Sequence, residues 1–357
     1  MLIGRSPVRI SFAGGGTDLP AYYEQFGGSV LSVAINKYFY TVLGKRDDGR
    51  IQIISSDLRI FEAWRDIAAM NIEGSALEIP VAVLKEIGRD LSIDLFLASE
   101  IPPGTGLGSS ASVCVNLLKT ITTYLHNPLS KYELAERAFT VARLMLKHHV
   151  GKQDEYAAAF GGLNFIDFSQ DGSATVTPVN AGAAILEQLQ QNLMLFFTGV
   201  SHHSWTILEE QEKSTRNHKG AAVDALHEVR ALAGQMLRLI ENGHLSNFGK
   251  LLNEAWQAKK RVSKDISNSR IDQLYRLARE NGALGGKITG AGGGGFLLLY
   301  CEPSQQEFVR SAMAAEGIHE MAFAFDFQGA QVIVNDPFID SDERGGARWV
   351  FVPRSVV

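Results

Sequence analysis

Three glycine-rich stretches are the clearest chemical feature of the sequence. They span residues 13–18, 102–110 and 285–295, and they account for the excess in a chain with 35 glycines, where average usage of about 7% gives about 25. Glycine allows backbone N–H groups to approach an anion closely. The second stretch ends in Ser109 and Ser110, which open a predicted helix whose first turn offers free N–H donors and the positive end of the helix dipole. This pattern predicts a phosphate-binding loop.

Two common nucleotide-binding motifs do not fit these stretches. A Walker A loop requires a lysine and then Ser or Thr after its last glycine, but Gly108 has no lysine after it and Lys287 is followed by Ile288. A dinucleotide-binding loop requires G-x-G-x-x-G, whereas Gly104, Gly106 and Gly108 are spaced G-x-G-x-G without an acidic residue about 20 positions later. A single run of this kind could be a turn that binds nothing, but three separate runs favour a binding function.

Composition narrows the class of protein. The chain has 357 residues, 39.0 kDa and 45% hydrophobic residues, enough for two hydrophobic cores. Its 34 basic and 39 acidic residues give a net charge of −5, which argues against a nucleic-acid partner. Cys114 and Cys301 have no disulfide or zinc spacing and are predicted to be buried. The sequence shows no signal peptide and no apolar run of about 20 residues, so we expect a cytoplasmic protein without a membrane partner.

Hydrophobic periodicity in the first half predicts alternating strands and helices. Strand 8–12 leads into the first glycine stretch and helix 20–26, and strand 93–98 leads into the second stretch and helix 109–124. Asp47, Asp48 and Gly49 predict a hairpin turn between two neighbouring strands. The further predicted elements of this half are strands 29–35, 38–43, 51–55, 163–168 and 174–179, and helices 77–88, 131–148 and 155–160.

The second half is predominantly helical up to the third glycine stretch. Helical periodicity covers residues 218–264 and 271–280. Strand 296–300, helix 304–316 and strands 321–327 and 330–334 are predicted after the glycines. We therefore predict an α+β protein with an N-terminal domain over residues 1–181, a C-terminal domain over 182–335 and a tail over 336–357.

The three stretches together resemble the motifs of the GHMP kinases. The matching residues are Pro7-Val8-Arg9 with Gly14-Gly15-Gly16-Thr17-Asp18, Pro103 to Ala111, the segment Gly151-Lys152-Gln153-Asp154-Glu155, and Lys287 to Gly295. Within that superfamily the chain is most similar to the heptose 7-phosphate kinases and the fucokinase-type sugar kinases. The resemblance covers residues 3–335 and implies a two-domain fold, with an N-terminal half like domain 2 of ribosomal protein S5 and a ferredoxin-like α/β C-terminal half.

The resemblance also implies which residues bind ATP, magnesium and sugar. The residues expected to bind ATP are Pro103, Gly104, Thr105, Gly106, Leu107, Gly108, Ser109 and Ser110, with Ser110 as a Mg²⁺ ligand. Those expected to bind the sugar are Gly15, Gly16, Thr17 and Asp18, together with Gly290, Ala291, Gly292 and Gly293 of a motif whose backbone should lie against the phosphate loop. Asp18 alone could instead be the N-cap of the helix that follows it.

Asp154 and Arg9 are the residues expected to act in catalysis. In the family, an aspartate at the position of Asp154 accepts the proton of the sugar hydroxyl, and an arginine like Arg9 lies beside it. An adjacent guanidinium would keep the carboxylate ionised and neutralise charge on the transferred group. Without the family, these two residues would be read as a surface ion pair or a helix cap.

One position departs from the family pattern. The glutamate that usually provides a second magnesium ligand is replaced by Ala142, and Glu133 and Glu136 should point elsewhere on a regular helix. Three explanations are open: Ser110, nucleotide phosphates and water hold Mg²⁺, or Glu155 substitutes, or the site is weakened. We favour the first, because Mg²⁺ commonly retains several waters.

The function implied is that of an ATP- and Mg²⁺-dependent kinase, monomeric or homodimeric. It would phosphorylate the anomeric hydroxyl of a heptose 7-phosphate, giving heptose 1,7-bisphosphate for nucleotide-heptose and surface-glycan synthesis. The alternatives are another monosaccharide kinase, such as a fucokinase or an octose 8-phosphate kinase, and a non-catalytic homologue that senses sugar and ATP.

Overall fold

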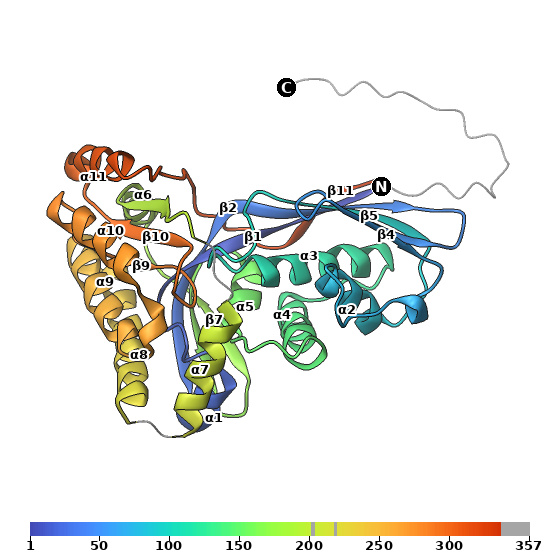
Figure 1. The fold of residues 1–357 in the computed structure, drawn as a ribbon, viewed down its shortest axis with the longest axis horizontal. Coiled ribbons are helices and arrows are strands. Elements are labelled where there is room, and N and C mark those ends of the chain that lie inside the picture. The colour runs from blue at the N-terminus through green and yellow to red at the C-terminus, as the bar shows by residue number, and fades with distance from the viewer. Residues whose placement is uncertain (201–203, 218–219, 337–357) are drawn as a thin grey trace.

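The computed structural model describes residues 1–200, 204–217 and 220–336, so all but the first residue of the predicted tail lies outside the described residues. Two β-sheets with helices packed against them make up the structure (Figure 1). The α+β class predicted from the sequence is confirmed. Within the described residues, no helix is both long enough and apolar enough to cross a membrane.

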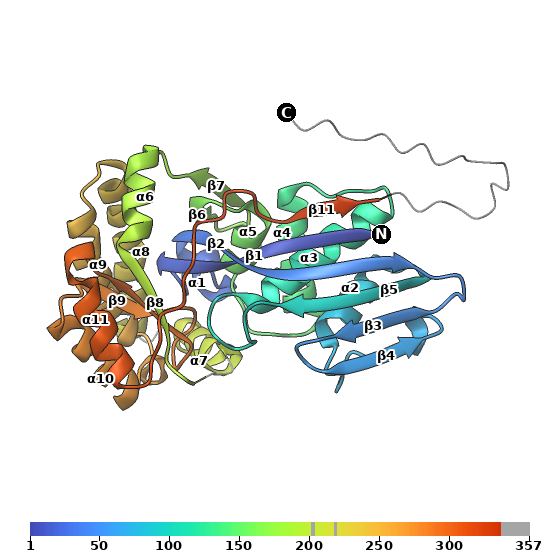
Figure 2. The same ribbon diagram turned by 90° about the horizontal axis from the view of Figure 1, so that it is seen from above.

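The larger sheet has the strand order β11-β1-β2-β5-β3-β4, with β6 and β7 continuing from part of β2 (Figure 2). Every neighbouring pair is antiparallel except β3 and β5. The strands are β1 (Leu2–Ala13), β2 (Gly28–Lys45), β3 (Ile51–Ser55), β4 (Ile60–Trp64), β5 (Ile93–Ser99), β6 (Leu163–Phe168), β7 (Ala174–Pro178) and β11 (Gln331–Asn335).

The predicted hairpin between strands 38–43 and 51–55 is wrong. Residues 29–43 belong to one long strand, β2, and β5 lies between β2 and β3. The connection crosses the start of β5, where the Arg46 N–H donates to the Ser92 carbonyl at 2.9 Å and the Ile93 N–H donates to the Arg50 carbonyl at 3.1 Å. A turn does form at the expected residues, but the strand that pairs with β2 and β3 comes from about 40 residues further along the chain.

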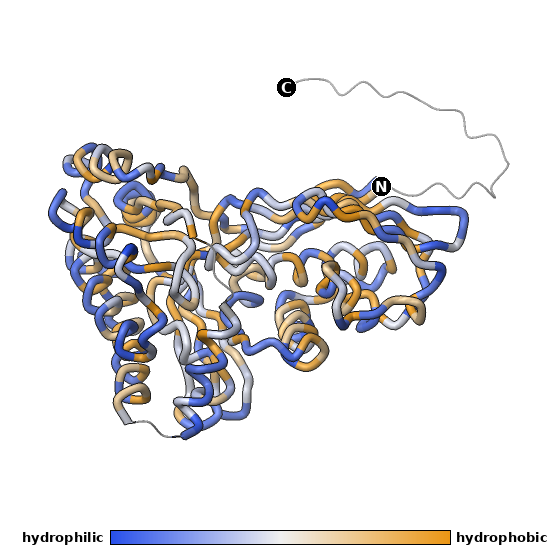
Figure 3. The backbone as a smooth tube through the Cα atoms, viewed as in Figure 1, coloured by the Kyte–Doolittle hydropathy of each residue, from blue (hydrophilic) through white to orange (hydrophobic). Residues whose placement is uncertain are grey.

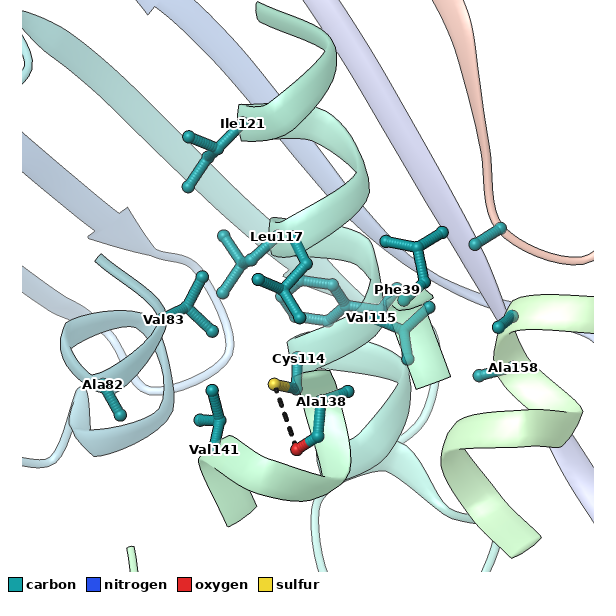
Figure 4. Packing of buried hydrophobic residues seen from close by; sticks show 14 of the residues in the cluster. Phe39, Ala82, Val83, Cys114, Val115, Leu117, Ile121, Ala138, Val141 and Ala158 are labelled. Atoms are coloured by element: carbon teal, nitrogen blue, oxygen red, sulfur yellow. Dashed lines mark hydrogen bonds between the residues drawn. The ribbon is translucent and has the colours of Figure 1, made fainter. Parts of the chain in front are cut away.

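Four helices cover one face of this sheet: α2 (Glu78–Ile87), α3 (Ser109–Tyr124), α4 (Lys131–Thr140) and α5 (Gln153–Phe160). Helix α3 is central, and its Val115, Leu117 and Ile121 are completely buried between the sheet and the other helices (Figure 4). Each such side chain stabilises the fold by about 1.5–3 kcal/mol. Hydrophobic segments run along the strands, whereas the outer helices alternate between hydrophobic and hydrophilic residues (Figure 3). Cys114 and Cys301 are both buried and unpaired, as predicted.

The helix predicted over residues 131–148 is shorter and changes its winding. It ends as an α-helix at Thr140 and continues as a π-helical turn, Val141–Met145. The Leu146 N–H donates to the Val141 carbonyl, five residues earlier, at 3.0 Å. Such single π turns are frequent at functional sites, and this one carries Ala142.

The smaller sheet has three strands among the described residues, in the order β8-β10-β9. The helices that surround it lie in the left part of Figure 1. The strands are β8 (Leu193–Phe197), β9 (Gly285–Ile288) and β10 (Phe296–Tyr300), and the remaining helices are α1 (Pro20–Phe26), α6 (Ala183–Gln191), α7 (Ser204–Arg216), α8 (Gly220–Glu241), α9 (Leu245–Lys260), α10 (Ser269–Glu280) and α11 (Pro303–Ala315).

The end of the second half differs from the prediction. Residues 321–327 do not form a strand, because this segment passes between the two sheets and makes only isolated bridges, Phe325 with Ile35 and the neighbouring Glu320 with Phe196. The next segment, β11, then pairs with β1 in the larger sheet. The predicted C-terminal domain of residues 182–335 therefore ends in a strand of the first sheet, and the boundary near residue 181 stays a prediction.

Candidate functional site

A cavity of about 610 Å³ lies where β1 ends and helices α3 and α5 begin. Its size is in the usual range for a small-molecule site. Residues from all three glycine stretches line it, together with residues of the segment 150–155. The tertiary structure thus brings together four segments that are far apart in the sequence.

Arg9 and Asp154 form a bidentate ion pair on the wall of this cavity. Arg9 donates from Nε to Oδ1 of Asp154 at 2.7 Å and from Nη2 to Oδ2 at 2.6 Å. The arginine on β1 is only 4% exposed, whereas the side chain of Asp154, in the first turn of α5, is 27% exposed and borders the cavity. A third donor of Arg9, Nη1, reaches the carbonyl of Gly106 at 2.7 Å. The pair is therefore not a surface ion pair, since one partner is buried and tied to the phosphate loop.

The predicted phosphate loop leads directly into helix α3. Gly108 is the N-cap residue, with φ +76°, and no side chain caps the helix. The backbone donors of the first turn therefore remain available to an anion. Among the predicted ATP-binding residues, Pro103, Gly104, Gly106, Gly108, Ser109 and Ser110 line the cavity, whereas Thr105 and Leu107 are buried beneath the loop.

The third glycine stretch packs against this loop, as predicted from the family. A Cβ atom on Gly290 would lie 2.7 Å from the carbonyl oxygen of Gly106, and one on Gly295 would lie 2.2 Å from that of Thr105. Side chains at these positions would push the two backbones apart. Gly290 and Ala291 also line the cavity.

Gly292 and Gly293 instead contact Ile266, outside the cavity. A Cβ on Gly292 would lie 2.7 Å from the carbonyl oxygen of Ile266, which also accepts a hydrogen bond from the Gly293 N–H at 2.9 Å. These two glycines allow the third glycine stretch to pack closely against Ile266.

The first glycine stretch places Gly15, Gly16 and Asp18 at the cavity. The carboxylate of Asp18 accepts hydrogen bonds from the N–H groups of Gly16 at 2.7 Å and Gln153 at 3.2 Å. The alternative role as helix N-cap is wrong, because the N-cap of α1 is Leu19. Burial, and then the charge of Asp154, raises the pKa of Asp18.

Thr17 has a different orientation from its neighbours. Its hydroxyl donates to the carbonyl of Gly14 at 2.8 Å and is 3.1 Å from that of Ser29. The side chain is completely buried and does not line the cavity. Thr17 therefore stabilises the conformation of the first glycine stretch.

Two buried lysines lie at this site, Lys287 at the start of the third motif and Lys259, which no sequence motif marks. Lys259 of α9, which lines the cavity, donates from Nζ to the Gly15 carbonyl at 2.8 Å and to Oε1 of Gln211 at 3.3 Å. Lys287 of β9 donates to the Ser11 carbonyl at 2.8 Å. Burial lowers the pKa of Lys259 to about 8 and that of Lys287 to about 7. Lys259 lies on the apolar face of its helix, and a charged residue at such a position is the signal that could have revealed it.

Helix α7 borders the cavity beside the first glycine stretch. Its Leu208 lines the cavity, and its Gln211 donates to the Gly16 carbonyl at 3.2 Å. Glu212 binds Arg143 of the π-helical turn at 2.9 Å and His149 at 2.8 Å. Helix α7 is therefore bound both to the first glycine stretch and to the segment that precedes α5.

Several residues of the cavity lining form an apolar group. They come from β5, α2 and the segments beside α2 and β3, and none of them has a sequence motif that marks it as functional. They are Leu58, Leu77, Ile79, Pro80 and Leu97. A flat, weakly polar ring would fit such surroundings better than a charged group would.

Ser110, Ala142 and Glu155 also line the cavity. Glu155 is 2% exposed and its Oε2 atom has no hydrogen-bond partner. Burial, and then the charge of Asp154, raises the pKa of Glu155 well above its ordinary value. Glu136 binds Lys152 and Tyr156, so it points elsewhere, as expected.

These groups fit a magnesium ion that also binds phosphate and water. Within the described part of the chain, no group of three His, Cys, Asp or Glu side chains could hold a metal by itself. The unpaired carboxylate oxygen of Glu155 and the Ser110 hydroxyl are hard oxygen donors, which Mg²⁺ prefers, and this ion is usually held by one or two protein groups.

Comparisons with known proteins agree with this geometry. The family models "GHMP kinases N terminal domain" and "GHMP kinases C terminal" match residues 75–162 and 236–319. D-glycero-alpha-D-manno-heptose 7-phosphate kinase of Campylobacter jejuni is 30% identical over 92% of this chain and 97% of its own length. L-fucokinase/L-fucose-1-P guanylyltransferase of Bacteroides fragilis is 27% identical over 85% of this chain and 35% of its own length. The crystal structure of a D-glycero-D-manno-heptose 1-phosphate kinase from Bacteroides thetaiotaomicron superimposes with a TM-score of 0.79 at 28% identity, over 94% of this chain and all of that one.

Proposed function

The chain belongs to the GHMP kinase family, and from that premise we propose that it phosphorylates the anomeric hydroxyl of a heptose 7-phosphate. It is a sugar kinase, a phosphotransferase that uses ATP and an alcohol acceptor. The product would be heptose 1,7-bisphosphate, a precursor for nucleotide-activated heptose and surface glycans. The heptose kinase likeness over nearly the whole chain supports this choice of sugar.

The observation that carries the proposal is the position of Asp154 between the two loops. A Cβ on Gly108, the N-cap of α3, would be 3.1 Å from Oδ2 of Asp154, so the carboxylate lies beside the phosphate loop. On the other side, Gln153 is hydrogen-bonded to Asp18 of the sugar loop. A hydroxyl bound there can donate its proton to Asp154 as its oxygen attacks the γ-phosphorus.

Arg9 fixes the orientation of Asp154 and balances its charge. Two parallel hydrogen bonds hold the carboxylate in one plane, and such charge-assisted pairs are stronger than neutral ones. The arginine also holds the Gly106 carbonyl, so the base and the phosphate loop keep a fixed relative position. Positioning of this kind is the main contribution that a protein makes to phosphoryl transfer.

ATP and the sugar would bind in the cavity on opposite sides of this pair. The apolar region of Leu58, Ile79 and Pro80 would take the adenine ring, and the N–H groups at the start of α3 would bind the phosphates. Mg²⁺, which GHMP kinases typically use, would be held by Ser110 and would neutralise charge on the phosphates. The sugar would lie against Gly16 and Asp18.

The proposal is tested by measuring ADP release with a panel of acceptors. The panel contains heptose 7-phosphate, heptose 1-phosphate, an octose 8-phosphate, fucose, free hexoses and mevalonate. We expect the highest kcat/KM with heptose 7-phosphate, and coupling of the new phosphorus to the anomeric proton in NMR of the product. A higher kcat/KM with another sugar would show that the chain is a kinase of that sugar instead. ATP binding without turnover of any acceptor would support the non-catalytic alternative. Ala142, which replaces the expected glutamate, is the residue that favours this alternative.

A further inference from the structure

Glu155 is a buried acid for which the protein provides too few partners. The side chain is 2% exposed, and its Oε2 atom lies away from solvent without a donor. Its own backbone N–H and the charge of Arg9 lower the pKa of Glu155, but burial and the charge of Asp154 raise it by more. Burying an unpaired carboxylate is costly, and such groups are usually paired or bound to a metal. The neighbouring Asp154 does not share this feature, because Arg9 pairs with both of its oxygens.

Helix α5, which carries Glu155, packs against helix α3, which carries Ser110. Ser110 and Cys114 are one turn apart and therefore share a helix face. Burial, and then the negative charge of Glu155, raises the pKa of Cys114. Ser110, Cys114 and Glu155 all line the cavity.

Ala142 is the third residue that bears on this proposed site. The thiol of Cys114 points to the carbonyl of Ala138 at 3.8 Å, so α3 packs against the end of α4 (Figure 4). Ala142 follows Ala138 by about one turn and also lines the cavity. Three elements thus contribute a hydroxyl, a methyl group and an unpaired carboxylate to the lining of the same cavity.

We propose that Glu155 provides the Mg²⁺ ligand that Ala142 cannot, so the unpaired oxygen of Glu155 favours the second explanation for Ala142 over the first, which the sequence alone favours. The proposal rests on the proposed function, because the ion would bind together with ATP. The small side chain of Ala142 leaves space for an ion, and Glu155 supplies the hard, negatively charged oxygen that Ala142 lacks. Bound Mg²⁺ would in turn give the Oε2 atom of Glu155 its missing partner.

The test measures binding of Mn²⁺, a paramagnetic substitute for Mg²⁺, by EPR titration of the full-length protein with a non-hydrolysable ATP analogue and no sugar. We expect Glu155→Gln to weaken Mn²⁺ binding at least about tenfold, while the analogue alone binds within about threefold of wild type. Moving the carboxylate, in the double variant Ala142→Glu with Glu155→Gln, should restore most of the affinity. Glu133→Gln is the matched control, because Glu133 lies on the exposed side of α4 and a glutamine can keep its capping box.

The outcomes separate this proposal from the proposed function. Unchanged Mn²⁺ affinity in Glu155→Gln, with no gain in the double variant, would overturn the role of Glu155 and leave the kinase assignment intact. Failure of the wild-type protein to bind the analogue would instead contradict the proposed function. If Glu155→Gln does not fold, a crystal structure of the wild type with Mn²⁺ and the analogue decides the question. The carboxylate should then lie within about 2.3 Å of the ion, and a carboxylate beyond hydrogen-bond distance of the ion and its waters would overturn the proposal.

Discussion

Arg9 and Asp154 are 145 residues apart in the sequence and are joined in the structure by two parallel hydrogen bonds of 2.7 and 2.6 Å. One residue belongs to the first strand of the large sheet and the other to the first turn of α5. Their pairing places an oriented carboxylate beside the N-terminus of α3, and this arrangement leads to the first two predictions.

Replacing Asp154 with asparagine should lower kcat by about 10²-fold or more, because the amide cannot accept the proton of the acceptor. ATP affinity should stay within about threefold, since the nucleotide is held mainly by backbone groups. Steady-state kinetics and nucleotide titration test both parts. Asp48→Asn is the control, because Asp48 forms a similar bidentate pair with Arg46 at an exposed position. Near-normal turnover in Asp154→Asn would contradict the role of Asp154 as base.

Replacing Arg9 with lysine should reduce kcat/KM by about tenfold or more, although the charge is kept. A lysine is a point charge and cannot bind both oxygens of Asp154 and the Gly106 carbonyl in one fixed geometry. Because both the base and the phosphate loop lose their support, we expect kcat to fall and the KM for ATP to rise. A change in only one of these constants would show that Arg9 supports one partner alone.

Replacing Gly106 with alanine should destabilise the protein and weaken ATP binding. The residue has φ +80°, and its new Cβ would lie 2.5 Å from the carbonyl oxygen of Thr289. Gly49→Ala is the matched control, because φ is +71° there and the space around it is open. The control should lose only about 1–2 kcal/mol of unfolding free energy, the cost of the left-handed backbone. Denaturant unfolding and nucleotide titration of both variants make the comparison, and equal losses would contradict the predicted packing of the two loops.

Lys287 should make the protein more stable as pH rises above neutrality. Its pKa in the folded protein is about 7, against 10.5 as the ordinary value, so between these two values the unfolded chain binds more protons. The free-energy cost of burying the charged form of Lys287 applies in full below pH 7 and disappears as the pH approaches 10.5. Relative to Lys287→Met, the wild type should therefore gain up to about 1.4 kcal/mol per pH unit across this window. Urea unfolding at a series of pH values measures the difference, and a difference that is constant with pH would contradict the effect.

Local sequence patterns by themselves determine much of this protein. The glycine stretches, the serines that open α3 and the periodicity of α2 and α5 depend on residues within a turn or two of each other. Backbone conformation, helix capping and amphipathicity act over that distance, so these elements can be placed from the sequence. The family resemblance then joins Arg9 to Asp154, a pairing that periodicity cannot reveal.

Only the tertiary structure decided which distant segments meet. It placed β5 between β2 and β3, returned β11 to the first sheet and turned the hydroxyl of Thr17 inward. It also buried Lys259 beside the sugar loop and left an oxygen of Glu155 without a partner. Strand partners and the burial of single charged groups depend on the simultaneous packing of the whole chain, because the stabilising contacts come from residues hundreds of positions apart. The binding chemistry of the glycine loops could therefore be predicted from the sequence. The buried groups that complete the site, Lys259 and Glu155, were determined by the tertiary structure.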